Sequence, residues 1–456
     1  MRQRERFSSR LGFILLSAGC AIGLGNVWKF PSITGQYGGA VFVLIYLVFL
    51  VIFGVPIMTM EFAVGRASQK SVSMAFHKLE PKGSKWHAFS WAAMAGNYLL
   101  MMFYTTVSGW ILAYLVYFAQ GRFSGLDAGE VAGVFGALTG SAGESVAWMT
   151  LMCLAGFGIC AIGLQKGVEF ITKIMMSALF VVLIALTVHS LALPGAMAGL
   201  EFYLKPSLAP IREYGLLKVV FAAMGQSFFT LSVGIGSMAV FGSYLNRDRR
   251  LTGEAINITL FDTIIALLAG LIVFPACFAF GVSPDAGPPL IFITLPNIFN
   301  SMPGGRAWGT LFFMFMLFAA LSTVVAVFEN IIAFAIDKTG CSRRKACAVN
   351  AALLAVLSLP CALGFNAWSG VRPFGAGSVI LDLEDFIVSY NLLPLGALVF
   401  LLFCVTRRGW KWENFIAEAD AGKGRRFPAK LKPYFVFVLP VMLLALYVFG
   451  IIDFFS

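Results

Sequence analysis

Long apolar stretches alternate with short polar segments along the whole chain. A helix needs about 20 consecutive, predominantly apolar residues to cross the hydrocarbon core of a bilayer. Eleven stretches approach that length, so we predict an all-α polytopic membrane protein with about eleven transmembrane helices. They lie near residues 11–36, 41–65, 89–119, 146–164, 168–193, 217–244, 255–281, 307–336, 346–364, 385–405 and 433–452.

Two of these stretches are poorly built for an unbroken helix. The first contains AGCAIGLGNVWKFP (residues 18–31) and the sixth contains GQSFFTLSVGIGSMAVFGSY (residues 225–244). Each combines closely spaced glycines with polar side chains. Unwound backbone inside a membrane is tolerated only where it is buried in protein or lines a cavity. Glycines that merely let helices pack closely are the alternative explanation, which is less suited to two such segments five spans apart.

Breaks in corresponding spans indicate two halves of five helices each, related as an inverted repeat with discontinuous helices one and six. The prediction divides the chain into four parts: a cytoplasmic N-terminal gate segment (1–10), a first five-helix repeat (11–193), a second five-helix repeat (217–405), and helix eleven with an external C-terminus (433–456).

The charges between the spans give the orientation. Lys and Arg gather before the first span and after the even-numbered spans two, six, eight and ten, whereas the other loops are poor in both. By the positive-inside rule the N-terminus is cytoplasmic, and an odd number of spans places the C-terminus outside. The net charge of +11 is therefore a topology signal, and we expect no nucleic-acid partner because no soluble segment is long enough to form a binding domain.

The residues that usually carry catalysis or metal binding are not arranged for it. The eight cysteines lie mostly inside spans without CxxC spacing, and the three histidines have no metal-ligand spacing. A membrane enzyme would need clustered acids, His or Cys at a membrane interface, and a channel would need a continuous polar file. Neither pattern is found, so we predict that the protein is not an enzyme and favour a transporter over a channel.

A broken helix offers two kinds of ligand at the gap. The N-terminal end of the second half presents free N–H groups and a positive dipole, which suit a carboxylate. Freed carbonyls at the end of the first half, with Asn26, Thr230 and Ser232 nearby, offer oxygens that suit a small hard cation such as Na⁺. The two breaks therefore predict a site for an ion and an anionic solute.

Five segments of the sequence resemble motifs of the sodium:neurotransmitter symporter family, whose bacterial members have the LeuT fold. These segments are RLGFILLSAGCAIGLGNVWKFP (10–31), VPIMTMEFAVGR (55–66), GQSFFTLSVGIG (225–236), IVFPACFAFG (272–281) and AALSTVVAVFEN (319–330). The resemblance covers nearly the whole chain. It implies a LeuT fold and secondary active transport.

The resemblance also implies two sodium sites. The first would use Ala21, Asn26 and Thr230, together with the substrate's carboxylate and Asp262 of the seventh span. The second would use the Gly19, Ile22 and Ala319 carbonyls and the hydroxyls of Ser322 and Thr323.

The substrate would lie between these sites. Its carboxylate would meet the Leu24 and Gly25 amides and the Tyr104 hydroxyl, and Tyr104 and Phe229 would form a lid. Its amino group would meet carbonyls around Ala21, Phe229 and Thr230, with Ser232. The side-chain pocket would be lined by Leu100, Val107, Phe229, Ile235, Ser322 and Val327.

Two positions narrow the substrate and ion requirements. Monoamine carriers of the family have an Asp where Gly23 stands, so this substrate should supply its own carboxylate, as an α-amino acid does. Asp262 is an acid inside an apolar span, where animal members of the family use chloride as the counter-charge. We therefore expect no chloride requirement, with Asp262 either binding Na⁺ or lying just behind it near Tyr46, Gln226, Thr230 and Ala266.

The family's gates are only partly matched. Lys29 and Asp385 would form an outer pair, with Lys in place of the usual Arg, and Arg4 and Asp337 would form the cytoplasmic pair. Glu61 would satisfy amides freed at the breaks. In the fifth span Gly167 is followed ten residues later by Ser177 and not by the family's Pro, which puts a Pro-assisted route for sodium release in doubt.

These observations together predict Na⁺-coupled symport of a neutral L-amino acid, hydrophobic or aromatic, into a bacterial cell by alternating access across its plasma membrane. A proton-coupled carrier of the same fold is the alternative. The hydroxyl pair Ser322 and Thr323, with no Lys near the second site in the fifth span, favours sodium, and Lys173 is the residue to check. The sequence does not identify the preferred amino acid or the oligomeric state.

Overall fold

The computed structural model of the protein describes residues 5–282 and 290–455. Within these ranges the chain forms helices and connecting turns, with a single isolated β-bridge between Arg249 and Lys423. The predicted all-α architecture is therefore confirmed.

The first five predicted spans are all helical. Span one is α1 (Arg10–Ala21) followed by the π-helical turn η1 (Gly25–Lys29) and α2 (Phe30–Gln36); span two is α3 (Ala40–Phe49), η2 (Leu50–Gly54) and α4 (Val55–Ser68); span three is η3 (Trp86–Ala88) and α6 (Phe89–Gln120); span four is α8 (Ala142–Ile162); span five is η4 (Leu164–Glu169) and α9 (Phe170–Leu191).

The later spans are helical as well. Span six is α12 (Leu216–Thr230) and α13 (Ser237–Ser243); span seven is α14 (Leu251–Ala279); span eight is α16 (Gly305–Thr339); span nine is α17 (Arg343–Leu357) and α18 (Leu359–Leu363); span ten is α19 (Ile380–Asp385), η6 (Phe386–Leu392) and α20 (Leu393–Val405); span eleven is η8 (Tyr434–Val438) and α22 (Leu439–Phe455).

Both predicted interruptions are present. Among the described residues, nine helices are long and apolar enough to cross a membrane without a break, and span one makes a tenth although it bends by 54° where α1 ends. Span six consists of a 15-residue and a 7-residue helix, each too short to cross alone, separated by the non-helical residues 231–236.

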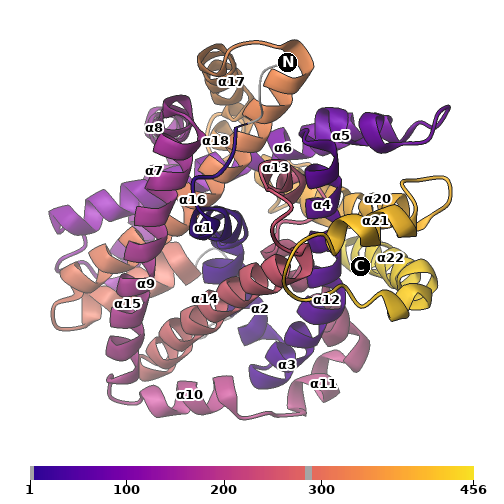
Figure 1. The fold of residues 1–456 in the computed structure, drawn as a ribbon. Helices are drawn as coiled ribbons and strands as arrows, with labels where there is room; N and C mark the ends of the chain where they lie inside the picture. Colours follow the sequence, from indigo (N-terminus) through magenta and orange to yellow (C-terminus); the bar gives the residue numbers. More distant parts are fainter. Residues whose placement is uncertain (1–4, 283–289, 456) are drawn as a thin grey trace.

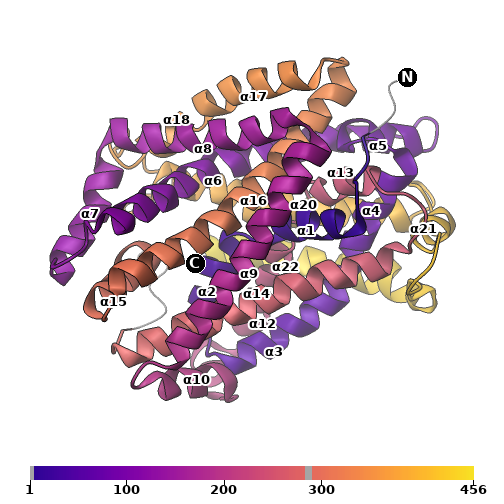
Figure 2. The same ribbon diagram turned by 60° about the vertical axis from the view of Figure 1, so that its left-hand side comes forward.

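Short helices in the connecting segments mark the two ends of the bundle. They are α5 (Val72–Leu79), α7 (Ala128–Gly140), α10 (Ala196–Leu204), α11 (Ala209–Tyr214), η5 (Leu290–Thr294), α15 (Leu295–Ser301), α21 (Trp412–Ala419) and η7 (Ala429–Leu431). Figure 2 shows α7, α10 and α15 at one end of the molecule, and α5, α13 and α21 at the other.

Helix α1 runs through the middle of the bundle, where Figure 1 shows it nearly end-on. It packs against α9, α14 and α16, and its residues from Gly12 to Ala21 are all buried. A helix that is apolar on every face is expected to lie inside a membrane protein and not at its lipid surface. Because α1 is central, the break at its end opens into the core and not toward lipid.

A seam of small residues holds α13, the second half of span six, against α4. A Cβ added to Gly242 would lie 2.5 Å from the Phe62 carbonyl oxygen, so the two backbones approach more closely than a larger residue would permit. Close approach through glycine is a usual way for membrane helices to pack. It fixes one side of the second break to span two.

Candidate functional site

A small cavity lies between the two breaks. Its volume is about 30 Å³. Eight residues predicted to bind substrate line it: Ala21, Leu24, Gly25, Leu100, Tyr104, Phe229, Ser232 and Ile235. Cys20, Gly23, Thr323 and Leu393 also line it, although the sequence analysis had not assigned them to the substrate.

Four other predicted substrate residues do not line this cavity. Val107, Thr230, Ser322 and Val327 are all buried. Thr230 and Ser322 instead take part in the polar clusters described below. Val107 and Val327 stay predictions, because a lining role for them needs a larger pocket than the described one.

The groups predicted to hold a carboxylate lie where the helix of span one resumes after its break. The Leu24 amide donates a hydrogen bond to the Tyr104 hydroxyl, at 3.1 Å. A Cβ added to Gly23 would lie 2.7 Å from Thr323 Oγ1, and closer still to the Tyr104 hydroxyl. The position has no room for a carboxylate side chain in this packing, so an anionic group must come from elsewhere.

Asp262 joins the two breaks and is fully buried. Its carboxylate accepts hydrogen bonds from Asn26 Nδ2 at 2.8 Å and from Thr230 Oγ1 at 3.0 Å. Within residues 5–282 and 290–455 no Lys, Arg or His forms an ion pair with it. A buried charge without a counter-charge is strongly unfavourable, so this cluster suits a cation. Three predicted residues of the first sodium site are therefore brought together.

All five predicted residues of the second sodium site also come together. Thr323 Oγ1 lies 3.1 Å from the Gly19 carbonyl oxygen, 3.2 Å from that of Ile22 and 3.3 Å from that of Ala319. Ser322 Oγ lies 3.1 Å from the Gly19 oxygen and 2.9 Å from the Ala319 oxygen. A set of neutral oxygens at these separations is the donor type that a hard cation prefers.

The break in span six is held by side chains from other helices. The Ser232 hydroxyl donates to the Cys20 carbonyl at 3.1 Å, which ties the second break directly to the first. The Gly234 amide donates to the Glu61 carboxylate, as predicted for an acid that satisfies freed amides. Ser232, Gly234 and Gly236 have positive φ angles of 50°, 107° and 82°. The two glycines adopt this conformation without strain, whereas Ser232 is a residue type that rarely adopts it.

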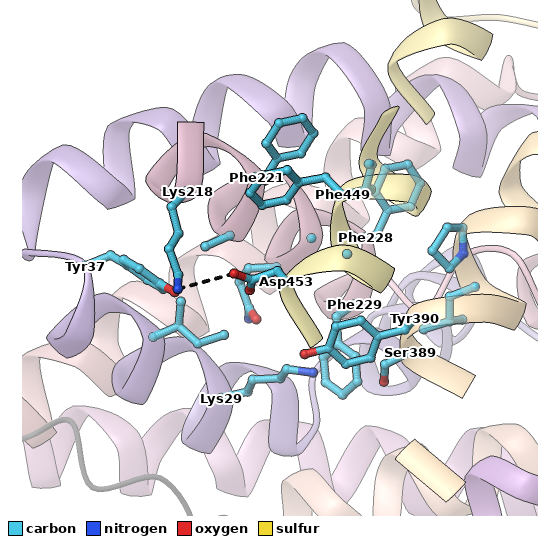
Figure 3. A pocket seen from close by; sticks show the side chains of 18 of the residues that line it. Lys29, Tyr37, Lys218, Phe221, Phe228, Phe229, Ser389, Tyr390, Phe449 and Asp453 are labelled. Atoms are coloured by element: carbon cyan, nitrogen blue, oxygen red, sulfur yellow. Dashed lines mark ion pairs between the residues drawn. The ribbon is translucent and has the colours of Figure 1, made fainter. Parts of the chain in front are cut away.

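A second, open cavity of about 240 Å³ lies beyond the first, between α2, α12, η6 and α22. Figure 3 shows its aromatic walls, Phe221, Phe229 and Phe449, and the ion pair that Lys218 and Asp453 form at 3.3 Å. Phe229 and Leu393 line both cavities, so these two side chains form the partition between them.

The predicted outer gate is not formed as an ion pair. Lys29 Nζ lies 3.8 Å from the centre of the Phe229 ring, and Asp385 instead accepts a hydrogen bond from Ser389 Oγ. In the described ranges no ion pair joins Lys29 to Asp385. The flexible ammonium stem reaches the ring face, where a cation–π contact replaces the bidentate pair that an Arg would favour.

A polar network that the sequence analysis did not identify lies between the N-terminal segment and spans six, eight and nine. Glu329 of α16 is fully buried and pairs with Arg343 of α17, and it accepts a hydrogen bond from Tyr244 at 2.8 Å. Arg343 also reaches Glu5, at 3.1 Å. The network joins the N-terminal segment to spans six, eight and nine. An acid and an Arg 14 positions apart were the only sequence signal for it.

Of the predicted cytoplasmic pair, Arg4 and Asp337, the structure describes only Asp337. Asp337 forms an ion pair with Lys70 at 3.3 Å and accepts from the Ser71 amide at 2.7 Å. Arg4 lies outside the described residues.

Lys173 of the fifth span forms an ion pair with Glu169. Its Nζ lies 2.7 Å from Glu169 Oε1, and Glu169 also accepts from the Ser8 and Ser9 hydroxyls. Lys173 is therefore paired away from the oxygens of the second sodium site. Gly167 lies in the π-helical turn η4, and Ser177 lies within the regular helix α9.

Comparison with known proteins gives one consistent family. The model of the sodium:neurotransmitter symporter family matches residues 4–124 and 136–456. An uncharacterized sodium-dependent transporter of Bacillus subtilis is 34% identical over 98% of both chains, and one of Haemophilus influenzae is 32% identical over 98% of both.

The chain is also similar to a solved structure and to an animal transporter. The crystal structure of MhsT in complex with L-phenylalanine superposes with a TM-score of 0.87, at 38% identity, and covers 98% of this chain and 99% of that chain. The sodium-dependent serotonin transporter of Drosophila melanogaster is 26% identical over 99% of this chain and 77% of its own length.

Proposed function

Because the chain belongs to the sodium:neurotransmitter symporter family, we propose that this sodium-dependent, multi-pass membrane symporter carries a neutral L-amino acid with a hydrophobic or aromatic side chain, together with two Na⁺ ions and without chloride. The family consists of sodium-coupled transporters and not of enzymes. The proposal concerns the substrate, the number of ions and the anion requirement.

The environment of Asp262 is the observation on which the proposal depends most. A fully buried carboxylate with two hydrogen-bond donors and no basic partner in the described chain calls for a cation. Na⁺ can meet it there because Asn26 and Thr230 supply further oxygens beside the first break. When it is ionised, this carboxylate would also replace chloride as the counter-charge.

The second ion is supported by the oxygens around Thr323. Five neutral oxygens from spans one and eight lie in one cluster, so an ion bound there would bridge the central helix α1 to α16. An ion that joins two helices can stabilise one arrangement of them over another, which is how ion binding is linked to alternating access.

The proposal of an amino-acid substrate is supported by the residues that line the smaller cavity, which we call the inner cavity. Gly23 leaves no protein acid at the break, so the substrate's carboxylate would meet the Leu24 and Gly25 amides and the Tyr104 hydroxyl. Leu100, Ile235 and Leu393 give the rest of the cavity an apolar lining. The similarity to MhsT, solved with L-phenylalanine, agrees with that class.

The arrangement supports an outward-facing or occluded stage of transport. The larger cavity opens on the side of α12 and α22, and the Glu329–Arg343 network closes the other end. With the N-terminus in the cytoplasm of a bacterial cell and the C-terminus outside, the five-plus-five halves would rock around the two breaks, first exposing and then releasing solute and ions inward.

Uptake into proteoliposomes tests the proposal. Labelled L-phenylalanine, L-leucine and L-alanine should accumulate when an inward Na⁺ gradient is imposed, and replacing chloride by gluconate should change the rate by less than about twofold. Equal uptake with K⁺, or uptake driven by a proton gradient alone, would contradict sodium coupling. Loss of uptake in gluconate would contradict the role given to Asp262.

Proton coupling is the second candidate within the same fold. It would need a basic side chain at the second ion site, and Lys173 pairs with Glu169 instead. The Na⁺, K⁺ and pH arms of the same experiment distinguish the two candidates.

A further inference from the structure

A pair of buried amides lies beside the break in span six. Asn97 of α6 donates to the Ile235 carbonyl at 3.0 Å and to the Ala93 carbonyl at 2.7 Å. Asn330 of α16 donates to Asn97 Oδ1 at 2.6 Å and to Ser237 Oγ at 3.3 Å. Both amides are fully buried. We call Asn97 and Asn330 the amide pair.

The amide pair is expensive to keep in a membrane interior, which suggests that it does more than fill space. Asn330 Oδ1 is buried without a hydrogen-bond partner in the described chain. An unsatisfied amide oxygen in an apolar interior is unfavourable, and apolar residues of similar size would avoid it. The bond that distinguishes the pair from ordinary helix side chains is the one from Asn97 to Ile235.

Ile235 connects the amide pair to the inner cavity. Its side chain lines that cavity together with Leu100, which lies one helical turn beyond Asn97. Its backbone lies between Gly234 and Gly236, both with positive φ, so no regular helix fixes it. The position of Ile235 therefore depends on bonds from other helices, and Asn97 supplies the one to its carbonyl.

We propose that Asn97, braced by Asn330, is a positioning residue that sets the size selectivity of the substrate pocket by fixing Ile235 at its wall. The inference rests on the proposed amino-acid transport. Asn97 does not line the cavity, so it would act through Ile235 and not by touching the substrate. If Ile235 is fixed, the pocket can discriminate between substrates whose side chains differ by a methylene. If Ile235 can move, the pocket adapts to both substrates and the discrimination is lost.

The test measures kcat/KM for uptake of L-alanine, L-valine, L-leucine, L-phenylalanine and L-tryptophan under one Na⁺ gradient. A fixed apolar pocket discriminates about 10- to 200-fold per methylene. We define the spread as the ratio of the highest to the lowest kcat/KM among the five substrates. In Asn97→Ala this spread should shrink at least about fivefold. Na⁺ half-saturation should change by less than about twofold, because neither ion site contacts the amide pair.

Two further variants sharpen the result. Asn330→Ala should reproduce the effect of Asn97→Ala, and the double variant should add little, because both act on one bond. Asn350→Ala is the matched control: Asn350 is a buried Asn that bonds Tyr98, the neighbour of Asn97, and it makes no bond to span six. It should leave the spread unchanged.

A measurement without transport tests the bond itself. Hydrogen–deuterium exchange of peptides covering residues 231–236 should be faster in Asn97→Ala than in the wild type and in Asn350→Ala. If Asn97→Ala is poorly produced, Gly96→Ala provides a second perturbation, since its Cβ would lie 3.0 Å from Ile235 Cγ2. It should alter the substrate spread while the Asn97 bond is kept.

The outcomes separate the two proposals. An unchanged spread in Asn97→Ala, or the same change in Asn350→Ala, overturns the positioning role. Unchanged exchange at 231–236 overturns it as well. A wild type that takes up none of the five amino acids would instead overturn the proposed substrate, and the selectivity role with it, while the exchange result would still show whether Asn97 holds the break.

Discussion

The breaks in spans one and six are built differently. In span one only residues 22–24 separate α1 from the next helical turn, and local bonds remain, such as that from the Ile22 amide to the Ala18 carbonyl at 2.6 Å. In span six residues 231–236 are non-helical, three of them have positive φ, and side chains from spans two and three, Glu61 and Asn97, hold them.

This difference suggests a different role for each break. The shorter break keeps a local bond and is also bonded to Tyr104 and Thr323, so its carbonyls have fixed positions, which suits ions that need a defined number of oxygens. A longer break held from outside can adjust with its supports, which suits a wall around a variable side chain. Substitutions of the residues proposed to bind ions should therefore change ion dependence, whereas substitutions of Glu61 and Asn97, which hold the second break, should change stability or selectivity.

The largest effect is expected from Asp262→Asn. The change keeps the shape of the side chain but removes its charge, and losing one partner of a buried charge pair costs roughly 3–5 kcal/mol. In chloride-free buffer, Na⁺-driven uptake should fall at least about 100-fold. Asp382→Asn, which alters the acid that accepts from the Val379 amide at the start of α19, is the control. Unchanged uptake in Asp262→Asn would remove the first break from ion binding.

Thr323→Val should have the next largest effect. It removes one hydroxyl from the proposed second ion site while keeping the volume, and a lost neutral ligand of this kind is worth about 1.5 kcal/mol, or roughly tenfold. The Na⁺ concentration for half-maximal uptake should rise by that factor. Thr187→Val, which changes a buried threonine of α9 bonded to Leu183, should not move it.

Glu61→Gln tests the support of the second break. The amide can still accept from Gly234, but a hydrogen bond to a charged group is stronger than one to a neutral group by about 1 kcal/mol. The detergent-solubilised protein should unfold a few degrees lower. Na⁺ half-saturation should stay close to that of the wild type. A large shift in Na⁺ dependence with unchanged thermal stability would erase the distinction between the breaks.

The smallest effect is expected at the outer gate. Asp385→Asn should change uptake by less than about twofold, because Asp385 bonds Ser389 and not Lys29. Lys29→Gln removes a cation–π contact worth about 0.5–1 kcal/mol, so a two- to fivefold change is expected. A similar, larger loss in both variants would instead indicate that the two residues pair at another stage of transport.

Apolar pattern predicted most of the fold. All eleven predicted ranges contain helices, and the two glycine-rich segments mark the two breaks, because lipid leaves the backbone few alternatives to a helix. The short helices α7, α10 and α15 were not predicted. Each is too short to produce a spanning pattern, and their packing depends on neighbours that the sequence does not identify.

The structure brings predicted site residues together where they lie close to the breaks. Asn26, Thr230 and Asp262 meet, and so do the five residues around Thr323, because motif residues on spans one, six, seven and eight converge there. Contacts that depend on side-chain reach were not predicted. The amide pair joins residues 233 positions apart, and Lys29 turns to a ring and not to an acid.

The contact between Lys29 and Phe229 bears on the timing of transport. Lifting the Phe229 ring away from the partition breaks one partly exposed cation–π contact of about 0.5–1 kcal/mol. That amount is close to thermal energy, so the ring should move aside often and let solutes and ions exchange with the larger cavity, the one between α2, α12, η6 and α22. Parting Glu329 from Arg343 leaves a fully buried carboxylate without its partly buried counter-charge and should be much less frequent. The protein should therefore spend its waiting time accessible from outside, with passage inward as the slow event.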